Sequence, residues 1–240
     1  MKKLAIYCPV RNSALDNAIK SLPVLPAPDG SITHLLLPVP SFGSDGNIRG
    51  GGNLDTVLSA LPPNITVIGG NLSHSSLTKY KTVDLLQDAI YVSENADITA
   101  RCALQLLMSC LPCTLKNCPV LLIGWGRIGK CLARLLRAND AAVTVCARKE
   151  TDRAMLGALG YHTQATPDPA GFRVVINTAP AVVLPQCPVG IFKMELSSVM
   201  GMTGEDVLWA RGLPAIYAPE SSGKLIADTV IRLLKEEDVL

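Results

Sequence analysis

The sequence has little net charge and lacks a long apolar run. Its 240 residues carry a formal net charge of +2, and lysine and arginine never occur in runs longer than two. A balance so close to neutral gives no electrostatic argument for a nucleic-acid or membrane surface. The longest helical apolar stretch, Cys102 to Cys113, is far shorter than the ~20 residues that span a bilayer. We therefore expect neither nucleic acid nor membrane as a partner.

A recognisable export signal is also missing. Leu4 to Val10 is a short apolar stretch that contains Pro9, and a small-residue cleavage site does not follow before Arg11. Several of the eight cysteines lie in apolar, periodic segments, so we expect packing thiols and not a disulfide framework. These features predict a cytoplasmic protein. A hydrophobic fraction of 48% is enough for a packed core.

Strand-like and helix-like segments alternate along residues 1–96, and this alternation predicts an α/β lobe. Apolar runs separated by helices indicate a parallel sheet covered on both faces. We expect this lobe to be the smaller of two and flavodoxin-like. The expected strands are Leu4–Cys8, His34–Leu37, Ile65–Ile68 and Ala89–Val92, and the expected helices are Ser13–Leu22 and Leu54–Leu61.

Residues 97–240 predict a second lobe with a doubly wound parallel sheet, since six apolar strands alternate with helices or loops. The helix Asp97–Leu111 is expected to connect the lobes, and the C-terminal helix 224–237 to bridge them. The expected strands are Val120–Ile123, Val143–Cys146, Tyr161–Thr163, Val174–Asn177, Gly190–Leu196 and Ala215–Ala218. The other expected helices are Arg127–Arg137, ended by a left-handed Asn139, and Ala154–Leu159.

A glycine turn follows the first strand of this second lobe. It is Gly124-Trp125-Gly126-Arg127-Ile128-Gly129, between a buried strand and an amphipathic helix. In that context the three glycines permit a tight turn, approach of a phosphate and close packing of helix on strand. The start of the helix offers free N–H groups to an anion. We predict a Rossmann domain that binds the pyrophosphate of a nicotinamide dinucleotide here; the alternative is a glycine turn without a ligand.

The end of the next strand indicates which dinucleotide is bound. An acid at this position holds the 2′-hydroxyl of NAD. Here Val145-Cys146-Ala147 runs into Arg148 and Lys149, two cations suited to a 2′-phosphate. The sequence therefore predicts NADP(H). A solvated basic loop is the alternative, and the nearby acids Glu150 and Asp152 would weaken its positive field.

Two other motifs are interpreted as structural. Cys110 and Cys113 have the spacing of a redox or metal pair, but they follow a helix C-terminus, where the helix dipole does not lower a thiol pKa. We expect inert thiols and no metal site. Arg49 with Gly50 to Gly52 is interpreted as a flexible loop in preference to a second anion loop, because a buried strand does not lead directly into it.

Histidine is scarce, and this argues against one class of enzyme. The chain contains only His34, His74 and His162. Dehydrogenases that act on 2-hydroxy acids need a general base, usually a histidine, late in the Rossmann lobe. After His162 no residue can fill that role, so a 2-hydroxyacid dehydrogenase is disfavoured.

Taken together, these segments resemble the A subunit of dipicolinate synthase, from about Asp84 to the C-terminus. The resemblance is carried by Asp84-Leu85-Leu86, Asn95 with Thr99-Ala100, Ile123 to Gly129, Val143 to Arg148, Val174 to Ala181, Glu195 to Ser198, and Ala218-Pro219. It implies two lobes like those of formate and 2-hydroxyacid dehydrogenases, and NADP(H) as cofactor. It also implies action on a cyclic dihydrodipicolinate precursor in sporulation, a small-molecule substrate. A separate flavoprotein-like B subunit is an implied partner, and a homodimer is left open.

The same resemblance implies roles for individual residues. Thr178, Ala179 and Pro180 would line the nicotinamide. Asn95, Thr99, Glu195 and Ser197 are the catalytic candidates, and the wider set of substrate-binding candidates adds Arg101, Ser198, Ser222 and Lys224.

The sequence departs from the family pattern in its substrate half. Arg101 and Cys102 replace an acid and a glycine, Ile98 replaces a proline, and Val199 to Met202 replaces a Pro-Gly-Gly turn. Glu220 to Gly223 replaces a Gly-Leu-Pro-Gly loop. An oxidoreductase similar to the dipicolinate synthase A subunit is the leading prediction. The second possibility is a non-catalytic NADP-binding or regulatory subunit. The third is an enzyme like the 2-hydroxyacid dehydrogenases.

Overall fold

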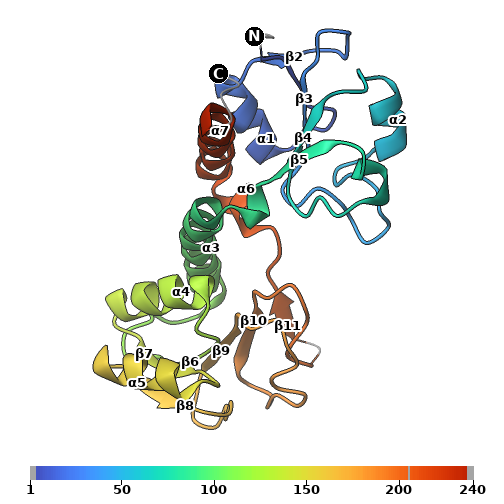
Figure 1. The fold of residues 1–240 in the computed structure, drawn as a ribbon. Coiled ribbons are helices and arrows are strands. Elements are labelled where there is room, and N and C mark those ends of the chain that lie inside the picture. The colour runs from blue at the N-terminus through green and yellow to red at the C-terminus, as the bar shows by residue number, and fades with distance from the viewer. Residues whose placement is uncertain (1–3, 205, 237–240) are drawn as a thin grey trace. The chain divides into compact units, whose positions relative to one another are not determined.

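The chain folds into two compact units, each with its own parallel sheet (Figure 1). The structure is a computed structural model and describes residues 4–204 and 206–236. The first unit combines the chain up to Asn95 with the chain from Pro214 onward, and the second unit spans Ala96–Leu213. The sequence predicted that residues 214–240 belong to the same domain as residues 97–213. In the structure this C-terminal segment belongs to the first unit instead. The bridging role expected of helix 224–237 stays a prediction, and its last residue, Glu237, lies outside the described residues.

The first unit contains a five-stranded parallel sheet in the order β2-β1-β3-β4-β5. This is the flavodoxin-like order, so the predicted fold class of the first lobe is confirmed. Its core lies under the central strands, where Leu35, Leu37 and Val67 pack against Leu54 and Leu58 of a covering helix. The strands are β1 (Ile6–Tyr7), β2 (Val24–Leu25), β3 (His34–Leu36), β4 (Thr66–Gly69) and β5 (Lys81–Asp84).

Asparagine side chains begin the short helices of the first unit. Asn12 accepts from the N–H of Leu15 at the start of α1 (Ser13–Ala18), and Asn53 accepts from Thr56 at the start of α2 (Leu54–Ser59). Single 3₁₀ turns cover Ile19–Ser21, Ser75–Leu77 and Leu85–Gln87.

Helix α7 (Pro219–Glu236) packs against α1 and completes the first unit. A Cβ at Gly223 would lie 2.4 Å from the carbonyl oxygen of Ala14, so the two helices approach as closely as a glycine permits. The prediction that this helix begins at Lys224 after a loop was wrong. Pro219 suits a first helical turn, and Glu220 there faces the positive end of the helix dipole.

The strand predicted at Ala89–Val92 was also wrong. These residues form the first turn of α3 (Ala89–Cys110), a helix of 22 residues that includes the connector predicted at 97–111. The Asp88 carboxylate accepts from the N–H of Tyr91 at 2.7 Å and so caps the helix start. Two strands of the observed sheet, β2 and β5, were not predicted; in β5 the exposed residues Lys81 and Thr82 leave no alternation of apolar and polar residues to recognise.

The second unit contains a six-stranded parallel sheet in the order β11-β10-β9-β6-β7-β8. Read from β8, this is the 3-2-1-4-5-6 order of a Rossmann sheet, so the predicted doubly wound fold class is confirmed. The strands are β6 (Pro119–Ile123), β7 (Ala142–Cys146), β8 (His162–Gln164), β9 (Val174–Asn177), β10 (Phe192–Glu195) and β11 (Val207–Trp209).

Helices connect the first three strands of this sheet, after α3 has entered the second unit at Ala96. They are α4 (Arg127–Ala138) between β6 and β7, and α5 (Glu150–Ala158) between β7 and β8. Loops join β9, β10 and β11 in the described part of the chain (Figure 1). From these loops Leu184 and Met202 pack on a cluster with Leu121, Ile123 and Val175 of the sheet. Loop side chains thus cover a sheet face on which a doubly wound sheet usually carries helices.

Two further predictions, both made for the predicted second lobe, were wrong. Asp140, with φ of 60°, takes the left-handed conformation expected of Asn139, whose φ is −102°. Residues Ala215–Ala218, predicted as the last strand, lie largely in the short helix α6 (Leu213–Tyr217). The sixth strand is β11, whose short apolar run Val207–Trp209 was not recognised.

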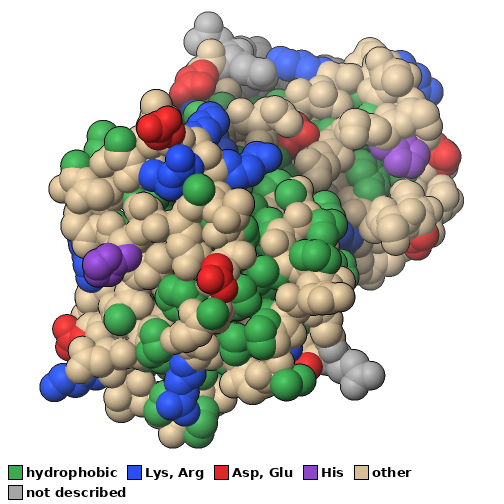
Figure 2. Space-filling model, turned by 90° about the horizontal axis from the view of Figure 1, so that it is seen from below, with side chains coloured by type: hydrophobic (Ala, Val, Ile, Leu, Met, Phe, Trp, Pro, Cys, Tyr) green, Lys and Arg blue, Asp and Glu red, His purple; other side chains and the backbone are tan. Residues whose placement is uncertain are grey.

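The surface carries isolated hydrophobic side chains among few charges. On the face that Figure 2 shows, green hydrophobic side chains are interspersed with blue Lys and Arg and red Asp and Glu side chains. The exposed large hydrophobic residues include Val182, Val189 and Val199 of the β9–β11 loops. Among the described residues, no helix has the length and apolar character required to cross a membrane.

Candidate functional site

The glycine turn of the second unit joins β6 to α4, and two of its glycines are required by packing. Gly124 has φ of 103°, and a Cβ there would lie 2.5 Å from the hydroxyl oxygen of Thr178. A Cβ at Gly129 would lie 2.2 Å from the carbonyl oxygen of Gly124. Gly126 differs, because a Cβ there would have no heavy atom within 4 Å. Gly126 therefore leaves open space beside the backbone, as close approach of a phosphate requires.

The N-terminus of α4 lies directly after Gly126. A side-chain hydrogen bond does not cap this helix start, and acidic residues are absent from its first turn. Arg127 and Ile128 occupy that turn, and Lys130 N–H is the first to bond back, to Gly126 at 2.9 Å. The preceding N–H groups and the positive end of the helix dipole suit an anion.

Trp125 lies within the turn, but its ring packs on the protein. The ring centroid lies 6.0 Å from that of Tyr161 in an edge-to-face arrangement, and Lys130 Nζ lies 5.9 Å from the Trp125 ring. These contacts fix the indole beside α4. Trp125 therefore contributes its backbone to the turn, while its indole ring packs against Tyr161 and Lys130.

The loop after β9 contacts the glycine turn. Thr178 donates through both its N–H and its hydroxyl to the carbonyl oxygen of Ile123, at 2.8 and 2.9 Å. Ala179 N–H donates to the side-chain oxygen of Asn177 at 2.9 Å. Thr178 and Ala179 are half-buried and Pro180 is exposed. The structure thus brings together the turn and the loop that the sequence predicted as two parts of a single cofactor site.

A buried carboxylate lies beneath this loop. Glu195 is 0% exposed, and it accepts from the Asn177 side-chain amide, from Ser197 N–H at 3.0 Å and from Gly201 N–H at 2.9 Å. The Ser197 hydroxyl donates to the carbonyl oxygen of Val199. Glu195 and Ser197, two of the catalytic candidates, therefore lie together. Their contacts to backbone groups favour a positioning role for both over proton transfer.

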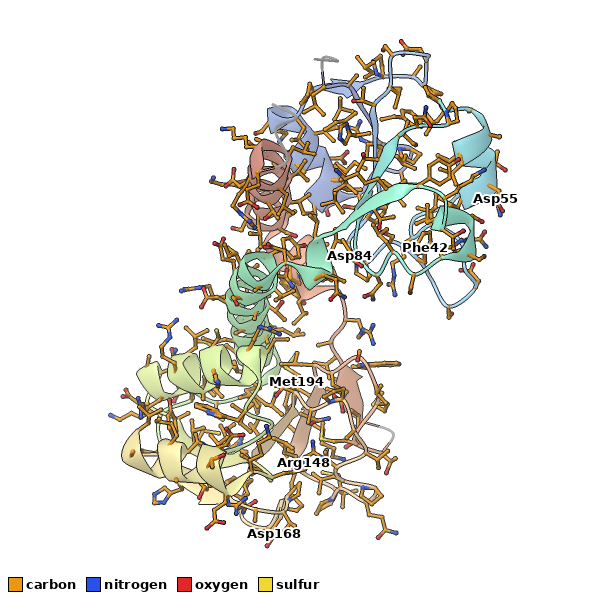
Figure 3. The ribbon with its side chains drawn as sticks, viewed as in Figure 1. Phe42, Asp55, Asp84, Arg148, Asp168 and Met194 are labelled. Carbon is orange, nitrogen blue, oxygen red and sulfur yellow. The ribbon has the colours of Figure 1, made fainter. Side chains whose placement is uncertain are left out.

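Arg148, labelled in Figure 3, lies with Lys149 in the loop after β7. The side chains of both residues are exposed. Glu150 and Asp152 lie in the first turn of α5, where they face the positive end of the helix dipole. Sequence reasoning missed a third cation, Arg153, whose guanidinium donates to the carbonyl oxygens of Ala147 and Arg148. A helical arginine leaves no sequence signal that it will turn back to such a loop.

Three candidates lie on α3, and the structure separates them between the units. Asn95 belongs to the first unit, whereas Thr99 and Arg101 belong to the second. Arg101 Nε lies 2.7 Å from a carboxylate oxygen of Asp97, whose other oxygen lies 3.3 Å from Arg134 Nη2. The hydrogen bond to Asp97 raises the pKa of Arg101 further above its usual value. Arg101 is thus an exposed, ion-paired cation on the helix surface.

The remaining substrate candidates are spread over both units. Ser198 is exposed in the second unit, and its carbonyl oxygen accepts from Arg211 at 2.8 Å. Ser222 is buried within α7 of the first unit. Lys224, one helical turn before Asp228, forms an exposed ion pair with it. Of the three, only Lys224 has its side chain paired with another in the described part of the chain, and the substrate roles of all three stay predictions.

The cysteines and one buried lysine are the remaining reactive groups. Burial raises the pKa of the Cys102 and Cys118 thiols. Among the described residues, no group of three or more His, Cys, Asp and Glu side chains is placed to hold a metal ion. Lys193, only 1% exposed, pairs with Asp206 at 3.2 Å, a contact that sequence reasoning also missed. Its place two residues before Glu195 puts both on one face of β10.

Comparison with known proteins identifies one curated relative. The dipicolinate synthase A subunit of Bacillus subtilis (strain 168) is 28% identical over 175 residues, which are 66% of this chain and 59% of the relative. The match thus spans less than two thirds of the relative's length. A scan against models of protein families finds no match.

Solved structures extend the similarity over nearly the whole chain. The dipicolinate synthase A subunit from Bacillus halodurans superposes with a TM-score of 0.81 at 21% identity, over 98% of each chain. The resemblance predicted from the sequence is confirmed. The D-lactate dehydrogenase of Escherichia coli has a TM-score of 0.66 at 11% identity, covering 98% of this chain and 97% of that one. The fold is therefore one that the A subunit of dipicolinate synthase shares with dehydrogenases.

Proposed function

We propose that this chain is an NADP(H)-dependent oxidoreductase, similar to the A subunit of dipicolinate synthase, which acts on a cyclic dihydrodipicolinate precursor. The observation that carries the proposal is the difference among the three glycines. Gly124 and Gly129 are required by packing, whereas Gly126 leaves room at an uncapped helix start. Gly126 has a φ of −80° and no packing contact that requires a glycine, so folding alone does not explain the residue type at this position of the turn. A dinucleotide pyrophosphate does.

Preference for a 2′-phosphate rests on Arg148 and Lys149. Both are exposed at the end of β7, where NAD-binding domains carry an acid. Charge-assisted hydrogen bonds from a guanidinium suit a phosphate. The similarity to dehydrogenases, D-lactate dehydrogenase among them, supports the nicotinamide class of cofactor without choosing between NAD and NADP.

When bound, a nicotinamide cofactor supplies or accepts a hydride. The residues of this chain have supporting roles in that chemistry. The turn Gly124–Gly129 would bind the pyrophosphate through backbone N–H groups, and Thr178 to Pro180 would line the nicotinamide ring. Asn177 would hold that loop rigid, since it is fully buried and its side chain bonds to both the N–H and the carbonyl oxygen of Ala179. Buried Glu195 would act through Asn177, whose amide it accepts from.

A second candidate is a non-catalytic NADP-binding or regulatory subunit. It is favoured by the engagement of the predicted reactive groups: Arg101 is paired with Asp97, and Glu195 accepts from three partners in the site. A 2-hydroxyacid dehydrogenase comes third. His162 is exposed at the start of β8, and the sequence contains no later histidine to serve as a general base.

Partners and location follow the same proposal. The curated relative is named as one subunit of a synthase, so we propose that the partner is a flavoprotein-like B subunit, with a homodimer as a further assembly. We also propose a cytoplasmic location and, by the same similarity, a role in sporulation.

Calorimetric titration of the purified chain with NADPH and NADH tests the proposal. NADPH should bind, and it should bind more tightly than NADH by roughly 1–3 kcal/mol, the scale of charge-assisted hydrogen bonds. Gly126→Ala should weaken both cofactors at least about tenfold, because the methyl group occupies the space of the phosphate. Thermal unfolding should be unchanged, since the methyl group meets no protein atom.

Gly157→Ala is the matched control. Gly157 lies in α5, and a Cβ there would also have no heavy atom within 4 Å. This variant should bind both cofactors normally and be slightly more stable, because alanine favours a helix over glycine. Equal binding by wild type and Gly126→Ala would move the pyrophosphate away from this turn and overturn the proposal.

A further inference from the structure

Arg153 turns back from α5 toward the loop that follows β7. Its Nη1 donates to the carbonyl oxygen of Ala147 at 2.8 Å and to that of Arg148 at 2.6 Å. One guanidinium nitrogen thus holds two consecutive carbonyl groups. Because the donor is charged, each of these bonds is stronger than a neutral one.

The backbone around these carbonyls is fixed from two further directions. Ala147 N–H donates to the carbonyl oxygen of Gln164 in β8 at 3.0 Å. Arg153 N–H donates to the carbonyl oxygen of Lys149 at 3.2 Å, within the first turn of α5. Lys149 itself precedes α5 without a side-chain cap. The loop of three residues is therefore tied to a strand, to a helix and to one side chain.

The side chains of Arg148 and Lys149 differ from the backbone of this loop, because they extend to the surface. Arg148 and Lys149 are exposed, whereas Ala147 beneath them is buried. Long cationic side chains lose much conformational freedom on binding a phosphate, and a mobile backbone would add to that loss. A fixed backbone removes the second contribution. Arg153 supplies this fixation by occupying the two carbonyl groups that would otherwise turn to water.

We propose that Arg153 is a positioning residue that sets the preference for the phosphorylated dinucleotide. It holds Ala147 and Arg148 so that the cations of Arg148 and Lys149 meet the 2′-phosphate, and it does so without touching the cofactor. This inference rests on the proposed function. It places part of the cofactor preference outside the strand end, in a helix residue.

The test measures NADPH and NADH dissociation constants for three variants beside the wild type. Arg153→Met should raise the NADPH constant about tenfold and change the NADH constant by less than about twofold. Arg153→Lys should recover part of the NADPH affinity, because an ammonium group can still hold one carbonyl. The double variant Arg148→Gln with Lys149→Gln should abolish the preference.

Arg137→Met is the matched control for loss of an arginine–carbonyl bond. Arg137 Nη1 donates to the carbonyl oxygen of Leu159 at 2.6 Å, at the other end of α5. The melting temperature of Arg137→Met should fall about as much as that of Arg153→Met. The ratio of its NADPH and NADH dissociation constants should equal that of the wild type. If Arg153→Met weakens both cofactors equally, or neither, Arg153 is only structural and the inference is overturned.

The outcomes separate this inference from the proposed function. If the double variant keeps the wild-type ratio, or the wild type shows no preference, the assignment of Arg148 and Lys149 to the 2′-phosphate fails. If the double variant loses the preference and Arg153→Met keeps it, the assignment stands and the role of Arg153 fails. Loss of preference in both variants, with partial recovery in Arg153→Lys, supports both.

Discussion

The side-chain amide of Asn177 donates to both carboxylate oxygens of Glu195, at 2.9 and 3.0 Å. The two residues are register partners on the adjacent parallel strands β9 and β10, and both are fully buried. Gly201 completes the arrangement, because a Cβ there would lie 2.4 Å from the Asn177 side-chain nitrogen. The loops after β9 and β10 are therefore held by a single pair of side chains.

Glu195→Gln should lower the free energy of unfolding by about 1–3 kcal/mol, the cost of leaving a buried polar group unsatisfied. The glutamine amide places a donor where the carboxylate accepts from Ser197 or Gly201 N–H. Urea unfolding measures the change. Glu94→Gln, an exposed site on α3, should stay within about 0.5 kcal/mol of wild type. Equal stability of the two variants, with turnover lost only in the first, would assign Glu195 to catalysis.

The preference for NADPH should depend on salt. Arg148 and Lys149 are exposed, so ionic screening acts on their attraction to a 2′-phosphate. Calorimetry at about 0.05 M and about 0.5 M salt should show the NADPH advantage shrinking, with NADH affinity less affected. A salt-independent advantage would point to buried groups in place of these two cations.

NADPH should quench the tryptophan emission of this chain chiefly through Trp125. The residue lies in the turn, within about 10–15 Å of a bound nicotinamide in this fold. Trp125→Leu should remove most of the quenching while calorimetric binding persists, because the turn uses backbone N–H groups. Trp209→Leu removes the other of the two tryptophans and should leave most of the quenching in place. Unchanged quenching in Trp125→Leu would place the cofactor elsewhere.

The isolated chain should bind the cofactor without catalysing dipicolinate synthesis. The resemblance to dipicolinate synthase A subunits implies that Arg101 stands where those proteins carry an acid, and Asp97 holds Arg101 in an ion pair. Loss of a positioned acid–base group typically costs about 10²–10⁴-fold in rate. We expect clear NADPH binding with little or no dipicolinate formed. An absorbance assay on freshly generated precursor, with and without the flavoprotein-like partner, measures this. Robust turnover by the isolated chain would contradict the prediction.

The Cys8 thiol should resist alkylation at neutral pH. Burial raises its pKa to about 11, and its Sγ donates to the carbonyl oxygen of Val10 at 3.2 Å. Because the thiolate is the reactive form, labelling should rise only as the pH nears that value. Cys110, expected from the sequence to be an inert packing thiol, is instead exposed, so peptide mapping after iodoacetamide treatment should find it modified first. In urea both should react alike, near the ordinary thiol pKa of about 8.5.

The sequence was sufficient for the central strands and the glycine turn of the second unit. Val174–Asn177 was predicted with its observed bounds, and Val120–Ile123 to within one residue. These strands are buried on both faces, so the apolar run and the strand coincide. At Ala89–Val92 the same signal failed, because a short apolar run does not distinguish a strand from a helix capped by Asp88.

The contacts around the candidate site were beyond sequence reasoning for a different reason. Arg153 and Asn177 act through hydrogen bonds to residues fixed by the fold, at positions set by the register of neighbouring strands. The residue types Glu195 and Ser197 were found by resemblance, but their backbone partners were not. The sequence pattern identifies candidate functional side chains, but the hydrogen-bond partners of those side chains are set by tertiary packing.

The pairing of α1 with α7 has a consequence for synthesis on the ribosome. The Ser13 hydroxyl donates to the carbonyl oxygen of Ala215, across 202 positions of sequence. The second unit is one continuous segment, so it can fold while translation continues. The first unit cannot bury the inner face of α1 until the last helix emerges. A nascent chain from which the residues up to about 213 have emerged should therefore resist protease across the Rossmann sheet and be cut within its N-terminal third.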